Sequence, residues 1–167
     1  KGFEDTQLTI IGGGKAERKD TEQIIDNNPN AVKFLGKIYD KHELIRQFRQ
    51  HSVFAMPSIH ETFGLVYLEA LSQNLACLYT KSQGIDGLFD DTVGVAVDSK
   101  SVDCIKNALR KLLLDRVKYG NQHVDFSQFR WRLIGEKYLN FYLDSLGIPN
   151  AKISLLTSFK KWGGGNT

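Results

Sequence analysis

Short apolar runs alternate with longer amphipathic stretches along most of the chain. Largely apolar runs of four or five residues predict buried strands, at residues 8–11, 31–35, 52–56, 75–79 and 93–97. Apolar residues that recur every three or four positions predict helices instead. Three helices are predicted at residues 16–26, 102–115 and 127–146. A further helix begins after its cap Asp40, and another ends near Gln73 with Asn74 as its C-terminal cap.

This alternation predicts an α/β fold. Strands that are apolar throughout belong in a parallel sheet that is covered on both faces. Repeated strand–helix units then give a Rossmann-like, doubly wound parallel sheet, which binds ligands beyond the carboxyl ends of its strands. Four loops are expected at that edge, at residues 12–14, 36–38, 57–64 and 81–87. At the helix start Asp40, with Glu43 three residues later, predicts a capping box.

Composition adds limits to this prediction. The chain has 167 residues, of which 41% are hydrophobic and 25% charged, as in an ordinary soluble globular domain. A net charge of +3 is too small to argue for nucleic acid as a partner. Cys77 and Cys104 lack metal-ligand spacing and are expected as reduced thiols in a cytosolic protein. We expect residues 1–147 to form one lobe and 148–167 a C-terminal extension, flexible or partly a remnant of cloning.

The chemistry concentrates in residues 57–71. A strand stops at Pro57, a short loop carries Glu61 and Gly64, and a nearly uncharged helix follows with Glu69 inside it. Helix N-termini attract anions because their first amides have no internal partners. Glu69 should lie roughly 8 Å from the start of the helix, measured along its axis. Two carboxylates around an anion site suggest a ligand with phosphate in the middle and hydroxyl groups at both ends.

Each of these features also has a plainer interpretation. The 12–14 glycine loop fits neither dinucleotide nor triphosphate fingerprints, and is most simply a tight strand-to-helix turn. The alternative is that it lets a flat ligand group approach the backbone closely. Glu69 shares a helix face with Thr62 and Ser72, as an ordinary solvated glutamate would. The helix is apolar almost all round, however, which predicts burial and therefore partners for that carboxylate.

A resemblance to a known family favours the functional interpretation. Residues 56–71, Met-Pro-Ser-Ile-His-Glu-Thr-Phe-Gly-Leu-Val-Tyr-Leu-Glu-Ala-Leu, resemble the Pro-Ser-x-x-Glu-x-Phe-Gly-x4-Glu-Ala signature of the retaining, nucleotide-sugar-dependent "group 1" glycosyltransferases. Residues 8–14, 32–37, 84–85 and 93–95 are similar to other elements of that family in the same order. The resemblance covers about residues 8–146. It implies the nucleotide-sugar-binding C-terminal lobe of a two-lobed GT-B fold, without that lobe's first strand–helix unit and its Gly-Arg and Lys.

The resemblance also implies a role for individual residues. Glu61 would be catalytic, contacting the transferred sugar and supporting positive charge at its anomeric carbon. Glu69 would accept hydrogen bonds from the ribose. Backbone amides would bind the donor phosphates at Phe63, Gly64 and Leu65, and the base would lie against Lys37 and Ile38. Further donor-site candidates are Thr62 and Gly14, with His60, Lys81 and Gly84 as weaker ones; Ile85-Asp86-Gly87 replaces the family's Ile-Pro-Glu.

The implied reaction needs a nucleotide-diphosphate sugar as donor and neither a cofactor nor a metal. Same-face attack assisted by the leaving phosphate is the family's usual proposal, so the two glutamates are not the acid and base of a glycoside hydrolase. A hexose would pass to a glycan or lipid-linked acceptor held by an N-terminal lobe that this sequence lacks, so this chain alone is expected to be inactive. Such enzymes serve polysaccharide, capsule, lipopolysaccharide or glycolipid synthesis.

Two alternatives stay open. The first is a non-catalytic module that binds nucleotide sugars. The second is a membrane-docking or structural piece, because Lys152, Phe159, Lys160, Lys161 and Trp162 mix cations with aromatic side chains as interfacial segments do; an exposed tail is the plainer interpretation. We expect no signal peptide, and no apolar run of this sequence is long enough to span a bilayer. The sequence therefore predicts a cytoplasmic protein, with peripheral contact at the inner face of the membrane as a further expectation.

Overall fold

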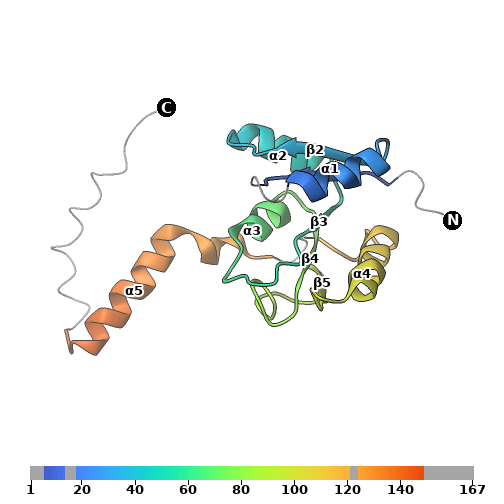
Figure 1. Cartoon of the computed structure of the whole chain (residues 1–167). Helices are drawn as coiled ribbons and strands as arrows, with labels where there is room; N and C mark the ends of the chain where they lie inside the picture. The colour runs from blue at the N-terminus through green and yellow to red at the C-terminus, as the bar shows by residue number, and fades with distance from the viewer. Residues whose placement is uncertain (1–5, 14–17, 121–123, 149–167) are drawn as a thin grey trace. The chain divides into compact units, whose positions relative to one another are not determined.

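The computed structural model describes residues 6–13, 18–120 and 124–148 (Figure 1). It forms two compact units, residues 1–123 and residues 124–167, and each is described by itself. The expected boundary after residue 147 stays a prediction. The aromatic and cationic residues of the tail lie outside the described residues.

The first unit alternates strands with helices, as the hydrophobic pattern predicts. Hydrogen bonds pair β1 with β2, and β4 with both β3 and β5, and every pair is parallel. The prediction of a parallel α/β fold is therefore confirmed. The elements are β1 (Leu8–Ile11), α1 (Arg18–Asn27), β2 (Val32–Gly36), α2 (Lys41–Arg49), β3 (Val53–Ala55), α3 (Leu65–Ser72), β4 (Ala76–Thr80), β5 (Gly94–Val97) and α4 (Val102–Leu114).

Hydrogen bonding groups these strands into two sheets, β1–β2 and β3–β4–β5. A histidine at the entrance to β3 connects them. His51 Nε2 lies 2.8 Å from Thr9 Oγ1 in β1, and its Nδ1 lies 2.6 Å from the carbonyl oxygen of Gln47 in α2. One side chain thus holds a strand of the first sheet to the helix that leads into the second.

The core lies around β4, which is buried along its whole length. Leu78 packs on one face of the strand and Tyr79 points to the other, since successive side chains of a strand alternate. On the Tyr79 face, Tyr67 of α3 makes an edge-to-face contact with ring centroids 6.3 Å apart. In Figure 1, α3 and α4 lie on opposite sides of this sheet. The cluster on the α4 side contains Ala76, Leu78, Val97, Ala108, Leu112 and Tyr119.

Burial on both faces explains why the β4 sequence is apolar throughout. Leu78 and Leu112 are fully buried, and each such leucine contributes about 1.5–3 kcal/mol relative to an exposed one. Gly94 of β5 is also dictated by packing, because a Cβ atom there would lie 1.8 Å from the carbonyl oxygen of Cys77.

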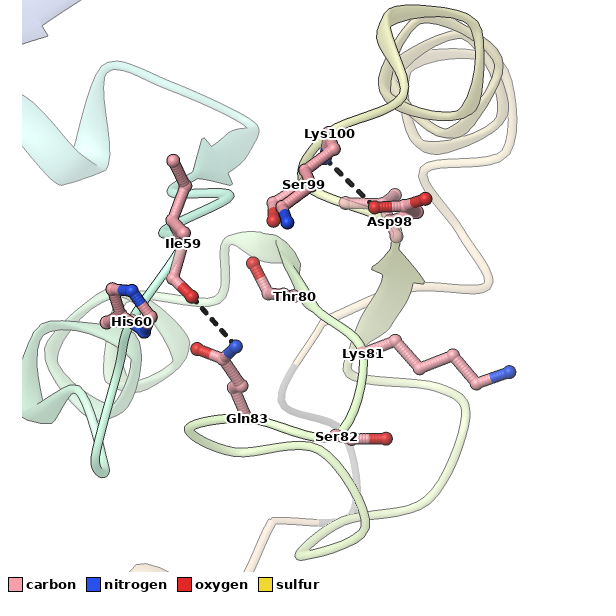
Figure 2. Close-up of a pocket in the computed structure, with 10 residues that line it drawn as sticks. Ile59, His60, Thr80, Lys81, Ser82, Gln83, Asp98, Ser99 and Lys100 are labelled. Carbon is pink, nitrogen blue, oxygen red and sulfur yellow. Dashed lines mark hydrogen bonds between the residues drawn. The ribbon is translucent and has the colours of Figure 1, made fainter.

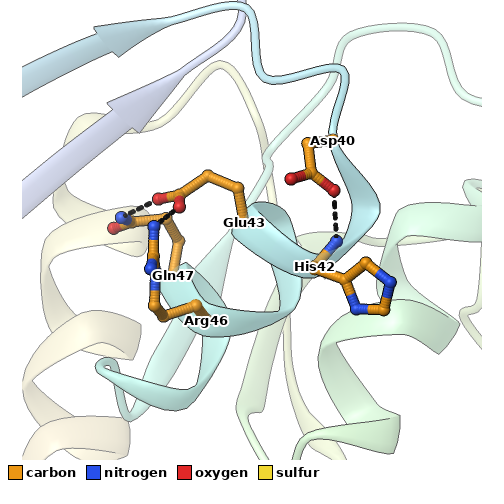
Figure 3. Close-up of polar contacts among 5 residues, drawn as sticks. All are labelled: Asp40, His42, Glu43, Arg46 and Gln47. Carbon is orange, nitrogen blue, oxygen red and sulfur yellow. Dashed lines mark hydrogen bonds and ion pairs between the residues drawn. The ribbon is translucent and has the colours of Figure 1, made fainter.

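The start of α2 confirms one capping prediction and corrects another (Figure 3). The carboxylate of Asp40 accepts a hydrogen bond from the His42 N–H at 2.9 Å, as an N-cap should. Glu43 does not complete the predicted capping box. Its carboxylate instead accepts from Gln47 Nε2 at 2.7 Å and pairs with Arg46. Side-chain neighbours three and four residues along the helix compete successfully for it.

The second unit contains a 3₁₀ turn, η1 (Phe126–Phe129), and the helix α5 (Trp131–Ser145). The prediction of one helix over residues 127–146 is wrong at its start, because Arg130 is extended, with φ −69° and ψ 127°. Asp125 explains the separate turn, since its carboxylate accepts from the Ser127 N–H at 2.9 Å. A hydrogen bond from the Ser127 side chain, and after it the one from the Ser127 N–H, lowers the pKa of Asp125.

Candidate functional site

Side chains from neighbouring elements hold the loop that follows β3. The hydroxyl of Tyr67 donates to the Met56 carbonyl at 2.5 Å, and the hydroxyl of Thr80 donates to the Ser58 carbonyl at 2.6 Å. The side-chain amide of Gln83 forms hydrogen bonds with the backbone of Ile59 and Glu61. Backbone polar groups that leave a sheet need new partners. Here α3 and the end of β4 supply them, so the predicted site loop has a defined conformation.

Glu61 lies within this loop and is half-buried. Its N–H donates to Gln83 Oε1 at 2.9 Å, and its carboxylate accepts from the Thr62 N–H at 2.9 Å. Gly84 lies close by, because a Cβ atom placed on it would be 3.2 Å from Glu61 Cγ. The structure therefore brings Glu61 and Gly84 together, two residues that the sequence analysis assigned to the same site.

Gly64 begins α3 in a left-handed conformation, with φ 74° and ψ 70°. No side chain caps this N-terminus. Of the amides that follow Gly64, that of Tyr67 already donates to the Gly64 carbonyl at 2.9 Å, whereas the first amides, those of Leu65 and Val66, have no acceptor within the helix. The partial positive charge of the helix end favours an anion at these first amides. Of the neighbouring candidates, Phe63 is half-buried, while Thr62 and Leu65 are exposed.

Glu69 is exposed, so its predicted burial is wrong. The helix buries the side formed by Tyr67, Ala70 and Leu71 and leaves Leu65 and Glu69 in solvent. These two residues are four apart and therefore lie on one face. An exposed carboxylate carries no desolvation cost and needs no protein partner, which makes it free to accept hydrogen bonds from a ligand.

The remaining candidates lie at the ends of other strands. Lys37 is exposed and Ile38 half-buried, directly after β2. The Gly12 N–H donates to the Gly36 carbonyl at 2.8 Å, which joins the loop after β1 to the one after β2. Gly14 lies outside the described residues.

A pocket of about 630 Å³ opens at the carboxyl ends of β4 and β5 (Figure 2). His60 and Lys81, both exposed, belong to its lining, although in Figure 2 the Lys81 side chain extends away from Ile59 and Thr80. Sequence analysis missed the contribution of the turn after β5, although that turn lies at the ligand edge by the same rule. The lining residues are Ile59, His60, Thr80, Lys81, Ser82, Gln83, Val97, Asp98, Ser99 and Lys100.

Buried hydroxyl and thiol groups behind the loop resist ionisation. Burial raises the pKa of Tyr67, and electrostatic interaction with Cys77 and Glu61 raises it further. Burial also raises the pKa of Cys77. The pKa of Tyr79 is raised to about 12, mainly by burial and further by its interactions with Asp86, Asp91 and Cys77. These groups are neutral at physiological pH and serve as packing and hydrogen-bond partners. Among the described residues, no three His, Cys, Asp or Glu side chains gather as metal ligands would.

The described helices include none with the length and apolar character that a bilayer crossing requires. The parallel strands, the helices between them and the loops at the carboxyl ends of the strands define an α/β unit. Solved structures confirm the fold as that of GT-B glycosyltransferases. Sucrose-phosphate synthase from Thermosynechococcus elongatus is 24% identical, with a TM-score of 0.68 over 84% of this chain and 39% of that one. HepE from Anabaena, in complex with UDP, is 20% identical, with a TM-score of 0.66 over 84% of this chain and 41% of that one.

Sequence comparison gives the family. Residues 1–129 match the family model "Glycosyl transferases group 1", so the chain belongs to this family. A GDP-mannose-dependent phosphatidylinositol monomannoside mannosyltransferase of Corynebacterium glutamicum is 29% identical over 149 residues, which are 81% of this chain and 38% of that protein. The sulfoquinovosyl transferase SQD2 of Arabidopsis thaliana is 32% identical over 116 residues, 67% of this chain and 22% of that protein. The chain thus spans well under half the length of these relatives.

Proposed function

We propose that this chain is the donor-binding, catalytic lobe of a retaining glycosyltransferase that uses a nucleotide-diphosphate sugar. One observation carries the proposal: a half-buried Glu61 in a braced loop precedes the uncapped N-terminus of α3, and the exposed Glu69 follows on the same helix. This arrangement offers a carboxylate, then backbone amides, then a second carboxylate. A nucleotide-diphosphate sugar presents the complementary groups in the same order.

In this proposal each end of the donor meets a different part of the site. The diphosphate binds the amides after Gly64, where the helix dipole favours negative charge. Glu69 accepts hydrogen bonds from the ribose hydroxyls, as an acceptor-only carboxylate can. The base lies against Lys37 and Ile38, at the end of β2. The transferred hexose lies on the Glu61 side of the diphosphate.

The proposed reaction breaks the bond between the anomeric carbon and the diphosphate oxygen. The electron pair stays on the diphosphate, whose growing charge the α3 amides stabilise, while the Glu61 carboxylate stabilises positive charge on the sugar. An acceptor hydroxyl attacks from the same face, its oxygen bonds to the anomeric carbon, and its proton passes to the departing phosphate oxygen. No covalent sugar–enzyme intermediate is required.

For the full-length protein we propose transfer of a hexose to a glycan or lipid-linked acceptor that a second lobe binds. The names of the relatives support a glycolipid, since one is a phosphatidylinositol monomannoside mannosyltransferase and another a sulfoquinovosyl transferase. Polysaccharide, capsule and lipopolysaccharide synthesis remain within the same proposal, as do a cytoplasmic location and peripheral contact with the membrane.

Substitution of the two glutamates tests the proposal in the full-length protein. Glu69→Ala should weaken nucleoside-diphosphate binding about tenfold, because the ribose loses a charged acceptor. Glu61→Ala should leave that affinity within about twofold but reduce kcat about 100-fold or more, because the lost interaction forms with the developing charge. Calorimetry with UDP, GDP and ADP and their sugars measures the first effect, and a transfer assay measures the second. Glu136→Ala, which removes an exposed carboxylate of the second unit that pairs with Arg132, serves as the control.

Wild-type affinity and turnover in both glutamate variants would refute the assignment. Donor binding without any transfer by the full-length protein would instead identify the alternative, a non-catalytic module that binds nucleotide sugars. The configuration of the product distinguishes retention from inversion.

A further inference from the structure

We propose that Gln83 is the positioning residue for Glu61, and that its side-chain amide sets where the catalytic carboxylate stands. The inference rests on the proposed function, because it concerns the residue that would face the transferred sugar. The sequence analysis assigned no role to Gln83. The inference comes from the contacts that its side chain makes with the loop after β3.

The Gln83 amide makes two hydrogen bonds to one short segment of backbone. Its Nε2 donates to the Ile59 carbonyl at 2.8 Å, and its Oε1 accepts from the Glu61 N–H at 2.9 Å. The two backbone groups flank His60, so the planar amide clamps three consecutive residues. Figure 2 shows the first of these bonds, with Gln83 reaching toward Ile59 from the turn after β4.

A primary amide is the side chain that this geometry requires. It carries a donor and an acceptor on one planar group, as a neighbouring strand would. A carboxylate accepts only, and an ammonium group donates only. No strand within residues 6–13, 18–120 or 124–148 pairs with the loop after β3, so Gln83 supplies two hydrogen bonds of the kind that a strand would make.

The direction of the Gln83 side chain is itself fixed by its turn. The flanking residues Ser82 and Gly84 have positive φ values of 61° and 58°. The Ser82 N–H donates to the Asp86 carboxylate at 2.5 Å, and the Gln83 N–H donates to the Thr80 carbonyl at 3.3 Å. Hydrogen bonds therefore fix this turn, and the turn places the Gln83 amide at a defined position relative to the end of β4.

Glu61 depends on this clamp because the hydrogen bond that its carboxylate makes comes from its own loop. Its carboxylate accepts from the adjacent Thr62 N–H, a contact that moves together with the loop. The position of the carboxylate therefore follows the position of the backbone. A misplacement of about 1 Å near reacting atoms can lower the rate about 100-fold, so even a small shift of residues 59–61 should lower kcat.

Neighbouring contacts make a local effect testable. Tyr67 binds the Met56 carbonyl and Thr80 binds the Ser58 carbonyl through side chains of their own, so both hydrogen bonds should persist when Gln83 is replaced. The connection from β3 to α3 thus keeps two attachments, and the phosphate-binding amides of α3 do not depend on Gln83. Loss of the clamp should alter residues 59–61 and leave the nucleotide end of the site intact.

The test uses Gln83→Met, which keeps the length of the side chain but cannot form the clamp, in the full-length protein. We expect kcat to fall at least tenfold, while KM for the donor and affinity for UDP or GDP change less than threefold. Hydrogen exchange at the Glu61 amide should become at least tenfold faster, because that N–H loses its acceptor. Gln83→Glu keeps an acceptor for that N–H but cannot donate to Ile59 when ionised, so its exchange should stay slow while kcat still falls.

Gln73→Met is the matched control. Gln73 is also half-buried, and its amide also makes two contacts, accepting from Arg49 Nε at 2.8 Å and donating to Ser72 Oγ at 3.0 Å, but it lies beyond the end of α3. The control should keep wild-type kcat. If Gln83→Met matched the control in kcat and in exchange at Glu61, or if kcat fell only together with nucleotide affinity, the proposal would be overturned. A normal kcat in Glu61→Ala would instead refute the function on which it rests.

Discussion

Tyr67 fills space that two glycines leave open. A Cβ atom on Gly64 would lie 2.6 Å from its ring, and one on Gly84 would lie 3.5 Å from it. The ring also meets Phe54 edge to face, with centroids 5.5 Å apart, and is 1% exposed. Its hydroxyl binds the Met56 carbonyl at the end of β3. At the scale of single residues, this tyrosine connects the core to the loop that carries Glu61.

Tyr67→Phe removes that hydroxyl and keeps the ring. We expect the free energy of unfolding to fall by about 1–2 kcal/mol, because the Met56 carbonyl loses a buried partner. Urea denaturation measures this. Tyr39→Phe should change the stability by less than about 0.5 kcal/mol, since Tyr39 is 87% exposed. Equal stability of the two variants would show that the short Tyr67 contact contributes nothing.

Local sequence patterns predicted some residues of the site and missed others. Glu61, Gly64 and Glu69 lie in one short stretch whose spacing along a strand, loop and helix is informative by itself. Gln83 lies 22 residues after the amide that it binds, so only the folded chain brings them together. The exposure of Glu69 also depends on packing, because an apolar helix can bury one side and leave another in water.

At the scale of elements, the predicted strands agree with the structure to within one or two residues at each end. The predicted C-cap of α3 is displaced by one residue: Gln73 is the C-cap, and Asn74 follows it in the left-handed conformation with φ 65°. The prediction of one continuous helix through Arg130 is wrong for a local reason. Apolar periodicity cannot distinguish a 3₁₀ turn and a helix from one long helix, because the Asp125 cap and one extended residue decide between them.

Gly64 shows how an element boundary depends on packing. Gly64→Ala should cost at least about 2 kcal/mol of stability, from the left-handed backbone and the clash with Tyr67 together. Gly87→Ala isolates the backbone part, because Gly87 has φ 79° and nothing within 4 Å of the added methyl group. That control should cost about 1 kcal/mol. Urea denaturation compares the two, and an equal cost would mean that Tyr67 moves aside freely.

For the whole molecule, parallel pairing explains why dispersed loops converge. The carboxyl ends of β3, β4 and β5 share one edge, so residues 57–64, 81–87 and 98–100 meet there. Sequence alternation predicted that residues 57–64 and 81–87 would share this edge, but it did not include residues 98–100. It could not predict that hydrogen bonds would divide the strands into two sheets joined by His51, since strand spacing depends on side chains from both sheets.

The same core makes the stability of the fold sensitive to alkaline pH. Burial raises the folded-state pKa of Cys77, and the folded-state pKa of Tyr79 is about 12, whereas unfolded cysteine and tyrosine titrate near about 8.5 and 10. The folded state therefore keeps protons that the unfolded state has released. Stability contributed by these groups is complete below about pH 8 and falls as pH rises, by up to about 1.4 kcal/mol per pH unit for each group.

Urea denaturation between pH 7 and 11 should follow this course, with the Cys77 contribution falling first and that of Tyr79 above about pH 10. Tyr79→Phe should flatten the decline above pH 10, because phenylalanine keeps the ring and has no proton to lose. Tyr39→Phe should leave the decline unchanged, since an exposed tyrosine meets solvent in both states. If Tyr79→Phe declined as steeply as the wild type above pH 10, the buried phenol would not be the group that links proton release to unfolding.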